Sequence, residues 1–262
     1  MLIGNMIELN KIYNEDCLET MKKMEDDVID LVITSPPYNM NLRIRNGKYC
    51  NKEFADGFST KYSDFFDGMP IEEYYEFHKK VITELLRVSK IVFYNIQIVT
   101  GSKRALFKLI GDFSNYIKDI IIWDKGFAQP AMHDGVLNSQ YEFIIIFEKD
   151  TTKSISRYFD KCNFKRGTLD NLWLIKREHN KNKNDVFHGA TFPKELVKKI
   201  LENFTNEGDI VYDPFMGTGT TAIVAINMNR QYIGSEITKE YFNLIEEKIK
   251  YEKTNIISNS LF

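Results

Sequence analysis

Short apolar runs alternate with longer amphipathic stretches along most of the chain. Runs typical of strands lie at residues 7–13, 28–33, 91–94, 116–123, 142–147, 210–212 and 231–236. Apolar residues recur at helical spacing in residues 18–24, 71–88, 102–113, 193–204, 221–228 and 239–251. This alternation predicts the α/β fold class, with a mainly parallel central sheet and helices on both faces.

Two stretches interrupt the pattern. Residues 39–70 show little periodicity but carry many aromatic side chains, together with Arg43 and Arg45. The aromatic content argues against plain disorder, and such a long irregular loop usually has a function. Residues 151–185 hold nine Lys or Arg against four acidic residues, although the whole chain has a net charge of −2. A basic segment on an acidic body is typical of local phosphate binding, and a solvated surface loop is the alternative.

Length and composition set broad limits. A chain of 262 residues allows one large α/β domain with a small insertion. The three cysteines are far apart and the four histidines have no zinc-ligand spacing, so we expect a reducing compartment and no metal site. No apolar run reaches the ~20 residues of a membrane span, and the first residues lack the features of a signal peptide. We therefore expect a cytoplasmic protein.

The segment Ser35-Pro36-Pro37-Tyr38 follows the apolar run 28–33 directly. Prolines cannot continue a strand interior, so the chain leaves the sheet there in a stiff turn. A hydroxyl and a carbonyl side by side can accept both hydrogens of an amino group, and the tyrosine ring can stack on a flat base. The segment predicts a site for a planar amine, although a rigid exposed turn would have the same sequence.

A second motif follows the apolar run 210–212 and precedes a helix: Asp213-Pro214-Phe215-Met216-Gly217-Thr218-Gly219-Thr220-Thr221. Its glycines permit a close approach of backbone to ligand, and N–H groups at a helix start favour polar or anionic groups. No phosphate-loop pattern for ATP occurs. Glu236 ends the next strand, where an acid can bind two ribose hydroxyls.

Together these motifs resemble the DNA amino-methyltransferases, which transfer a methyl group from S-adenosylmethionine to an exocyclic amine of adenine or cytosine. The base-site motif precedes the cofactor motif, an order similar to the β group of that family. The resemblance implies a Rossmann-like methyltransferase fold in permuted order. It covers nearly the whole chain, apart from residues 39–70 and 151–185.

The resemblance also implies roles for individual residues. Ser35, Pro36, Pro37 and Tyr38 would be catalytic, and no cysteine would act as a nucleophile. The S-adenosylmethionine contacts would be Asp16, His188, Thr191, Phe192, Asp213, Phe215, Gly217, Thr218, Gly219, Thr220 and Glu236. Asp16 precedes a helix and could instead be only its N-cap, and His188 could be a surface cap. Glu142 stays open, and Trp123 is expected in the core.

The partner implied is double-stranded DNA, with a homodimer and a cognate restriction endonuclease as partners that the family allows. The candidate DNA contacts are Arg43, Arg45, Lys161, Lys165, Arg166 and Arg177. Residues 1–150 would form a catalytic half in which 39–70 is a mobile DNA-facing loop. Residues 151–185 would recognise the target, and 186–262 would bind the cofactor within the same catalytic domain.

The target base and the substrate class remain open at this point. Serine at position 35 slightly favours cytosine N4 over adenine N6, because many relatives with adenine targets carry Asp there. An RNA or protein amine methyltransferase is one alternative, although the glutamine methyltransferases place the cofactor motif first. A non-catalytic DNA-binding relative is the other, and the intact motifs argue against it.

Overall fold

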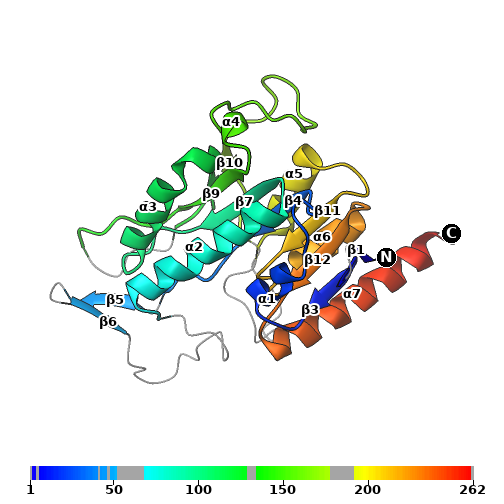
Figure 1. Ribbon diagram of the computed structural model, residues 1–262, viewed down its shortest axis with the longest axis horizontal. Helices are drawn as coiled ribbons and strands as arrows, with labels where there is room; N and C mark the ends of the chain where they lie inside the picture. Colours follow the sequence, from blue (N-terminus) through cyan, green and yellow to red (C-terminus); the bar gives the residue numbers. More distant parts are fainter. Residues whose placement is uncertain are drawn as a thin grey trace.

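An eight-stranded sheet forms the centre of the molecule in the computed structural model (Figure 1). Its order is β10-β8-β9-β7-β4-β11-β12-β3, and all neighbours are parallel except β9, which is antiparallel to β7 and β8. The strands are β3 (Lys11–Tyr13), β4 (Leu31–Thr34), β7 (Ile91–Ile96), β8 (Ile117–Asp124), β9 (Tyr141–Glu148), β10 (Leu172–Leu174), β11 (Ile210–Asp213) and β12 (Gln231–Ser235). The predicted fold class is confirmed.

The structure describes residues 2–3, 6–40, 42–45, 48–51, 68–128, 134–177 and 192–260. Two small antiparallel hairpins lie outside the main sheet: β1 (Leu2–Ile3) with β2 (Ile7–Glu8), and β5 (Leu42–Arg45) with β6 (Lys48–Asn51). The second hairpin corrects part of the expectation of an irregular loop at 39–70. None of the helices in the described ranges has the length and apolarity needed to cross a membrane.

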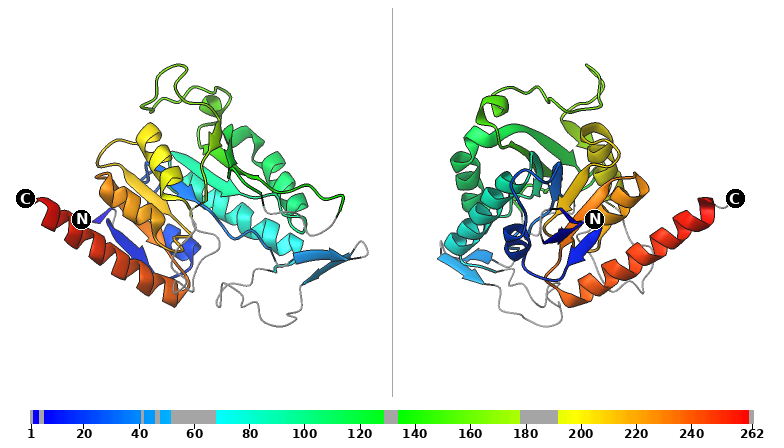
Figure 2. Two further views of the ribbon diagram at one scale, coloured as in Figure 1. Left: turned by 180° about the vertical axis from the view of Figure 1, so that it is seen from behind. Right: turned by 45° about the vertical axis from the view of Figure 1, so that its right-hand side comes forward.

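Helices cover both faces of the sheet (Figure 2). One face packs against α1 (Cys17–Lys22), α2 (Ile71–Val88) and α3 (Lys103–Asp112), and the other against α5 (Lys194–Phe204), α6 (Thr220–Asn227) and α7 (Lys239–Ser260). Strand β4 shows why both faces are apolar: Val32 lies in the first core, whereas Leu31 and Ile33 lie in the second. A strand buried on both sides reads as a continuous apolar run. The shorter elements are the 3-10 helix η1 (Ser114–Tyr116) and α4 (Thr151–Ser154).

Several boundaries differ from the sequence pattern. The apolar run 28–33 enters the sheet only at Leu31, because Ile29 forms an isolated bridge with Ser89 and Asp27 has a positive φ of 60°. Strand β10 lies within residues 151–185 and was not expected. It pairs with β8 and buries Trp173, so part of the predicted target-recognition segment extends the catalytic sheet.

The topology brings distant residues to one edge of the sheet. In a parallel sheet the carboxyl ends of the strands lie together, which is where such folds bind ligands. The ends of β4, β7, β11 and β12 therefore meet there. Because β9 is antiparallel, its first residues reach the same edge, and Glu142 lies opposite Trp123 at the end of β8.

Candidate active site

The turn Ser35–Tyr38 leaves the sheet at the end of β4 and is held from several sides. Pro36 is buried, and the Tyr74 hydroxyl donates to the Pro37 carbonyl at 3.1 Å. The Ser102 hydroxyl donates to the Tyr38 carbonyl at 3.1 Å. Helices α2 and the start of α3 thus fix the backbone of this turn. This supports the prediction of a stiff turn at the strand end.

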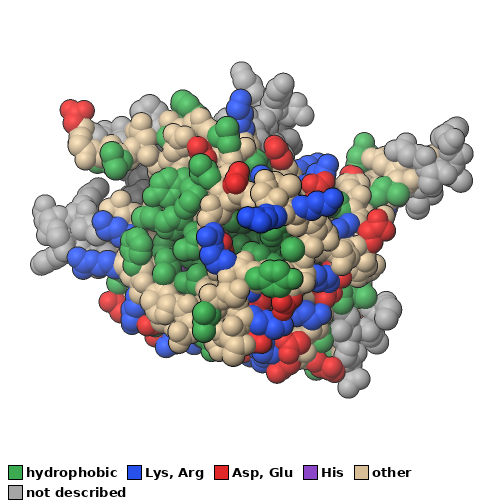
Figure 3. All heavy atoms as spheres, turned by 90° about the horizontal axis from the view of Figure 1, so that it is seen from above, with side chains coloured by type: hydrophobic (Ala, Val, Ile, Leu, Met, Phe, Trp, Pro, Cys, Tyr) green, Lys and Arg blue, Asp and Glu red, His purple; other side chains and the backbone are tan. Residues whose placement is uncertain are grey.

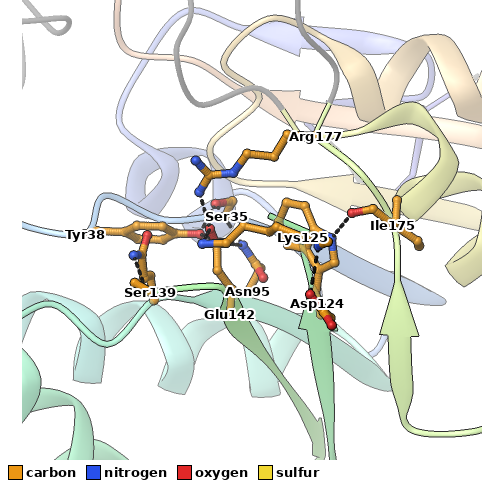
Figure 4. Close-up of polar contacts among 12 residues, drawn as sticks. Ser35, Tyr38, Asn95, Asp124, Lys125, Ser139, Glu142, Ile175 and Arg177 are labelled. Carbon is orange, nitrogen blue, oxygen red and sulfur yellow. Dashed lines mark hydrogen bonds and ion pairs between the residues drawn. The ribbon is translucent and has the colours of Figure 1, made fainter. Parts of the chain in front are cut away.

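The Tyr38 hydroxyl lies at the centre of a polar network (Figure 4). Its oxygen is 2.8 Å from the Ser35 hydroxyl and 2.9 Å from the Glu142 carboxylate, and it accepts a hydrogen bond from the Asn95 amide. The same amide donates to Glu142 at 2.8 Å. These contacts fix the orientation of the tyrosine ring, whose hydroxyl end faces the strands β7 and β9.

Glu142 is almost fully buried and is compensated by two cations. Its second carboxylate oxygen is 3.2 Å from the Lys125 ammonium and 2.9 Å from the Arg177 guanidinium. Glu142 and Lys125 are each 4% exposed, whereas the Arg177 side chain is 42% exposed. Buried charges persist only when they are paired in this way. Burial lowers the pKa of Lys125, although Glu142 opposes the shift.

The second motif is linked to the first by a buried carboxylate. Asp213, at the end of β11, accepts hydrogen bonds from the Thr34 hydroxyl (3.0 Å), the Thr221 hydroxyl (2.7 Å) and the Phe215 N–H (3.0 Å). Burial raises the pKa of Asp213 to about 6, and these hydrogen bonds oppose the shift. Because Thr34 precedes Ser35, Asp213 fixes the two motifs relative to each other.

Glu236 follows β12 and faces the glycine turn. Its carboxylate accepts from the Gly217 N–H at 2.8 Å and from the Thr238 N–H at 2.9 Å. Burial raises the pKa of Glu236, and these two N–H groups oppose that shift. Gly217 and Gly219 have positive φ values of 55° and 83°, and a Cβ at Gly219 would lie 3.1 Å from Ile245. This turn therefore requires glycine at residue 219.

Comparison with known proteins matches residues 29–247 to a family model described as DNA methylase, the N6/N4 methyltransferase family. This match spans both motifs and most of the chain. The chain belongs to the N6/N4 DNA methylase family.

Relatives of this DNA methylase include two named methyltransferases. The type II methyltransferase M.BglII of Bacillus subtilis is 28% identical over 90% of this chain and 68% of its own length. The orphan methyltransferase M.BamHII of Bacillus amyloliquefaciens is 30% identical over 86% of this chain and 90% of its own.

Two solved structures share the fold. The PvuII DNA methyltransferase, described as cytosine-N4-specific, is 18% identical with a TM-score of 0.65, covering 95% of this chain and 92% of its own. The complex of M1.HpyAVI with SAM is 20% identical with a TM-score of 0.62, covering 91% of this chain and 98% of its own.

The predicted cofactor residues of the methylase are placed as follows. Asp16 caps α1, since its carboxylate accepts from the Leu18 N–H at 2.7 Å, and it lies at the end of β3 beside β12. Phe215 is partly buried against the core beside Phe77. Phe192 packs edge-on against Trp123, which is buried as expected. His188 and Thr191 lie outside the described residues.

Among the predicted DNA contacts, the structure describes the side chains of Arg177, Lys161, Lys165 and Arg166. Arg177 lies in the polar network of the site, whereas Arg43 and Arg45 are described only as backbone in β5. Lys161 pairs with Asp209 at 2.5 Å, and Asp209 precedes β11 at the opposite edge of the sheet from Ser35. Lys165 and Arg166 are exposed in a turn. The face seen from above Figure 1 mixes basic, acidic and hydrophobic side chains (Figure 3).

Sequence reasoning missed two residues of the site, Asn95 and Lys125, and left the role of Glu142 open. Each is a polar residue at an end of a strand that is otherwise strongly apolar, and each is buried. A polar residue at the end of an apolar strand is the sequence signal that could have identified them. Among the described residues, no group of three or more His, Cys, Asp or Glu side chains is arranged to hold a metal ion.

Proposed function

We propose that this protein is an S-adenosylmethionine-dependent DNA methyltransferase that methylates the exocyclic amine of a flipped base, cytosine N4 or adenine N6. The observation that carries the proposal is the bridge from Asp213 to Thr34. It holds the base-site turn of β4 beside the glycine turn of β11, as transfer between two bound groups requires. The family match and the names of the relatives support DNA as the substrate.

The residues at the ends of β3, β11 and β12 fit S-adenosylmethionine. Glu236 uses one lone pair of each oxygen on a backbone N–H, which leaves lone pairs for two ribose hydroxyls. Asp16 has a second carboxylate oxygen available for the adenine amine beyond its helix cap. The backbone of Gly217, Thr218, Gly219 and Thr220, with Phe215 beside it, would line the same site. When bound, the cofactor supplies an activated methyl group.

The chain's own contribution is to position the amine. The Ser35 hydroxyl and the Pro36 carbonyl accept its two hydrogens, which directs the nitrogen lone pair toward the methyl group. The Tyr38 ring, fixed through its hydroxyl, stacks on the base. Flipping costs a few kcal/mol and places the base against Ser35 and Tyr38. Positioning and local dipoles then supply most of the rate enhancement.

Three finer parts of the proposal concern the target base, the biological origin and the DNA contact. Serine at position 35 slightly favours cytosine N4. The relatives' names include both a type II and an orphan methyltransferase, so we propose an origin in a restriction-modification system with or without a nuclease partner. Arg177, half exposed and paired with Glu142 in the site, is the DNA contact we favour, whereas Lys161 is left out because it lies with Asp209 at the opposite edge of the sheet.

The deciding experiment is methylation of mixed-sequence duplex DNA with labelled cofactor, followed by digestion and separation of nucleosides. We expect label in N4-methylcytosine, and N6-methyladenine would retain the mechanism but remove the role of Ser35 in base choice. Ser35→Ala should lower the rate about 100-fold or more, because it removes one acceptor of the amine hydrogens. Cofactor binding without label in DNA would refute the DNA assignment and point to RNA or protein substrates.

A further inference from the structure

A serine hydroxyl is ambiguous in the role assigned to Ser35. It carries one hydrogen and two lone pairs, so it can donate or accept, whereas an amino group offers hydrogens to an acceptor. If the Ser35 hydrogen pointed toward the bound base, it would face the amine hydrogens, and the like partial charges would repel each other. The proposed function therefore requires that the Ser35 hydrogen be directed elsewhere.

The contacts around Tyr38 determine where each hydrogen goes. Lys125 and Arg177 can only donate, so Glu142 is held as a carboxylate that can only accept. The Tyr38 and Glu142 oxygens are 2.9 Å apart, so the single tyrosine hydrogen must lie between them. Burial raises the pKa of Tyr38, and Glu142 adds to the shift, so this hydrogen stays on the tyrosine.

The Asn95 amide strengthens this assignment. Its nitrogen is 2.8 Å from the same Glu142 oxygen, which excludes the flipped orientation because that would oppose two acceptor oxygens. The same nitrogen contacts the Tyr38 oxygen, so Asn95 donates there and Tyr38 accepts. The Ser35 and Tyr38 oxygens are 2.8 Å apart, and the only hydrogen left for that contact is the serine's own.

We propose that Glu142, acting through the Tyr38 hydroxyl, makes the Ser35 hydroxyl an obligatory hydrogen-bond acceptor toward the amine of the target base. The serine hydrogen points to Tyr38, one serine lone pair accepts from the Asn95 amide at 3.4 Å, and the other lone pair is left for the amine of the base. Glu142 is thus a positioning residue for the reaction, and it selects an amino over a keto group. The inference rests on the proposed function and deepens it.

The isosteric change Glu142→Gln should reverse the network. Lys125 and Arg177 still require an acceptor, so the glutamine oxygen turns toward them and its NH₂ group faces Tyr38. This NH₂ group can no longer accept from Tyr38 or from Asn95, so the Tyr38 hydrogen loses the acceptor that fixed it and can be donated to Ser35. The Ser35 hydrogen is then displaced toward the bound base, where it suits a keto oxygen and opposes an amine.

The test first requires that the wild type methylates DNA, because without this activity the proposed function itself fails. Duplexes are then compared in which the target base is replaced by its keto counterpart, uracil for cytosine or hypoxanthine for adenine. We expect Glu142→Gln to shift the ratio of keto to amino affinity at least tenfold toward keto relative to wild type, and to slow single-turnover methylation about 30-fold or more. An unchanged affinity ratio would overturn the proposal.

Two further variants distinguish a changed direction of the Ser35 hydrogen bond from a general disturbance of the fold. Tyr38→Phe keeps the ring but removes the acceptor of the serine hydrogen, so it should shift the same ratio toward keto, and it serves if Glu142→Gln does not fold. The matched control is Glu148→Gln at the other end of β9, near Lys118 (3.9 Å), which should leave both the ratio and the rate within about twofold. Equal effects of Glu142→Gln and Glu148→Gln would refute the inference.

Discussion

Asp213→Asn tests the buried carboxylate that links the two motifs. Asp213 is 5% exposed, and its pKa is raised from 3.8 to about 6 because burial disfavours the charge. The folded protein therefore binds this proton more tightly than the unfolded chain does. The resulting stability is fully present below pH 3.8 and is lost as the pH rises through 6.

The size of the effect follows from the shift. A difference of about 2 pKa units corresponds to about 3 kcal/mol, of which about 2 kcal/mol lies above pH 4. Asparagine has nearly the same shape and no charge, and the Thr34 and Thr221 hydroxyls can rotate to match it. We therefore expect the free energy of unfolding of Asp213→Asn, minus that of wild type, to rise by about 2 kcal/mol between pH 4 and 7.5.

Urea denaturation monitored by tryptophan fluorescence would measure this difference, because Trp123 and Trp173 are both buried. If the variant loses a hydrogen bond, its free energy of unfolding falls by the same amount at every pH. The change of the difference with pH is then unaffected. Glu25→Gln, at an exposed position, is the control and should run parallel to wild type. A flat difference curve for Asp213→Asn across pH 4 to 7.5 would refute the reasoning.

Three other predictions concern the cofactor turn and the sheet edge. Glu236→Gln should weaken S-adenosylmethionine binding at least tenfold by calorimetry, because a neutral amide binds ribose hydroxyls less well and its NH₂ group opposes one of the two backbone N–H groups; a cooperative thermal transition is the control for folding. Gly219→Ala should lower the free energy of unfolding by about 1 to 3 kcal/mol, because its φ is 83° and its Cβ would lie 3.1 Å from Ile245. Gly111→Ala, in open space within α3, should be neutral or stabilising, and equal thermal denaturation of the two would contradict this account. Trp173→Ala should cost about 3 to 5 kcal/mol, since this side chain is 1% exposed, and a loss below about 1 kcal/mol would show that β10 adds little to the fold.

The elements that the sequence predicted are those marked by a pattern within their own residues. Helix α2 has the predicted bounds of 71–88, because its apolar residues recur on one face and Pro70 precedes it. The strand β10 has three residues, and Trp173 is its single buried side chain between two exposed leucines. Its stability comes from pairing with β8, which is a tertiary contact with no periodic pattern in the sequence.

The candidate site likewise has a part that the sequence predicts and a part that only the tertiary structure reveals. Ser35 to Tyr38 and Asp213 to Thr221 could be found because each is a continuous motif after an apolar strand. Asn95 reaches Tyr38 because β7 lies parallel beside β4, and Glu142 reaches it because β9 runs antiparallel beside β7. Neither segment's sequence reveals which strand it pairs with or in which direction. The same antiparallel pairing places Glu142 next to Lys125. The DNA contacts remain a prediction, because charge counts do not reveal which cations, such as Lys161, are already ion-paired.

The adjacency of β4 and β11 also affects how the protein is made. Thr34 and its partner Asp213 are 179 residues apart in the chain. At a synthesis rate of roughly 5–20 residues per second, β11 is made on the order of 10 to 35 s after β4. Strand β3 pairs with β12, so the interval between the synthesis of these two strands is longer still. A nascent chain that still lacks β11 and β12 therefore cannot assemble the candidate site.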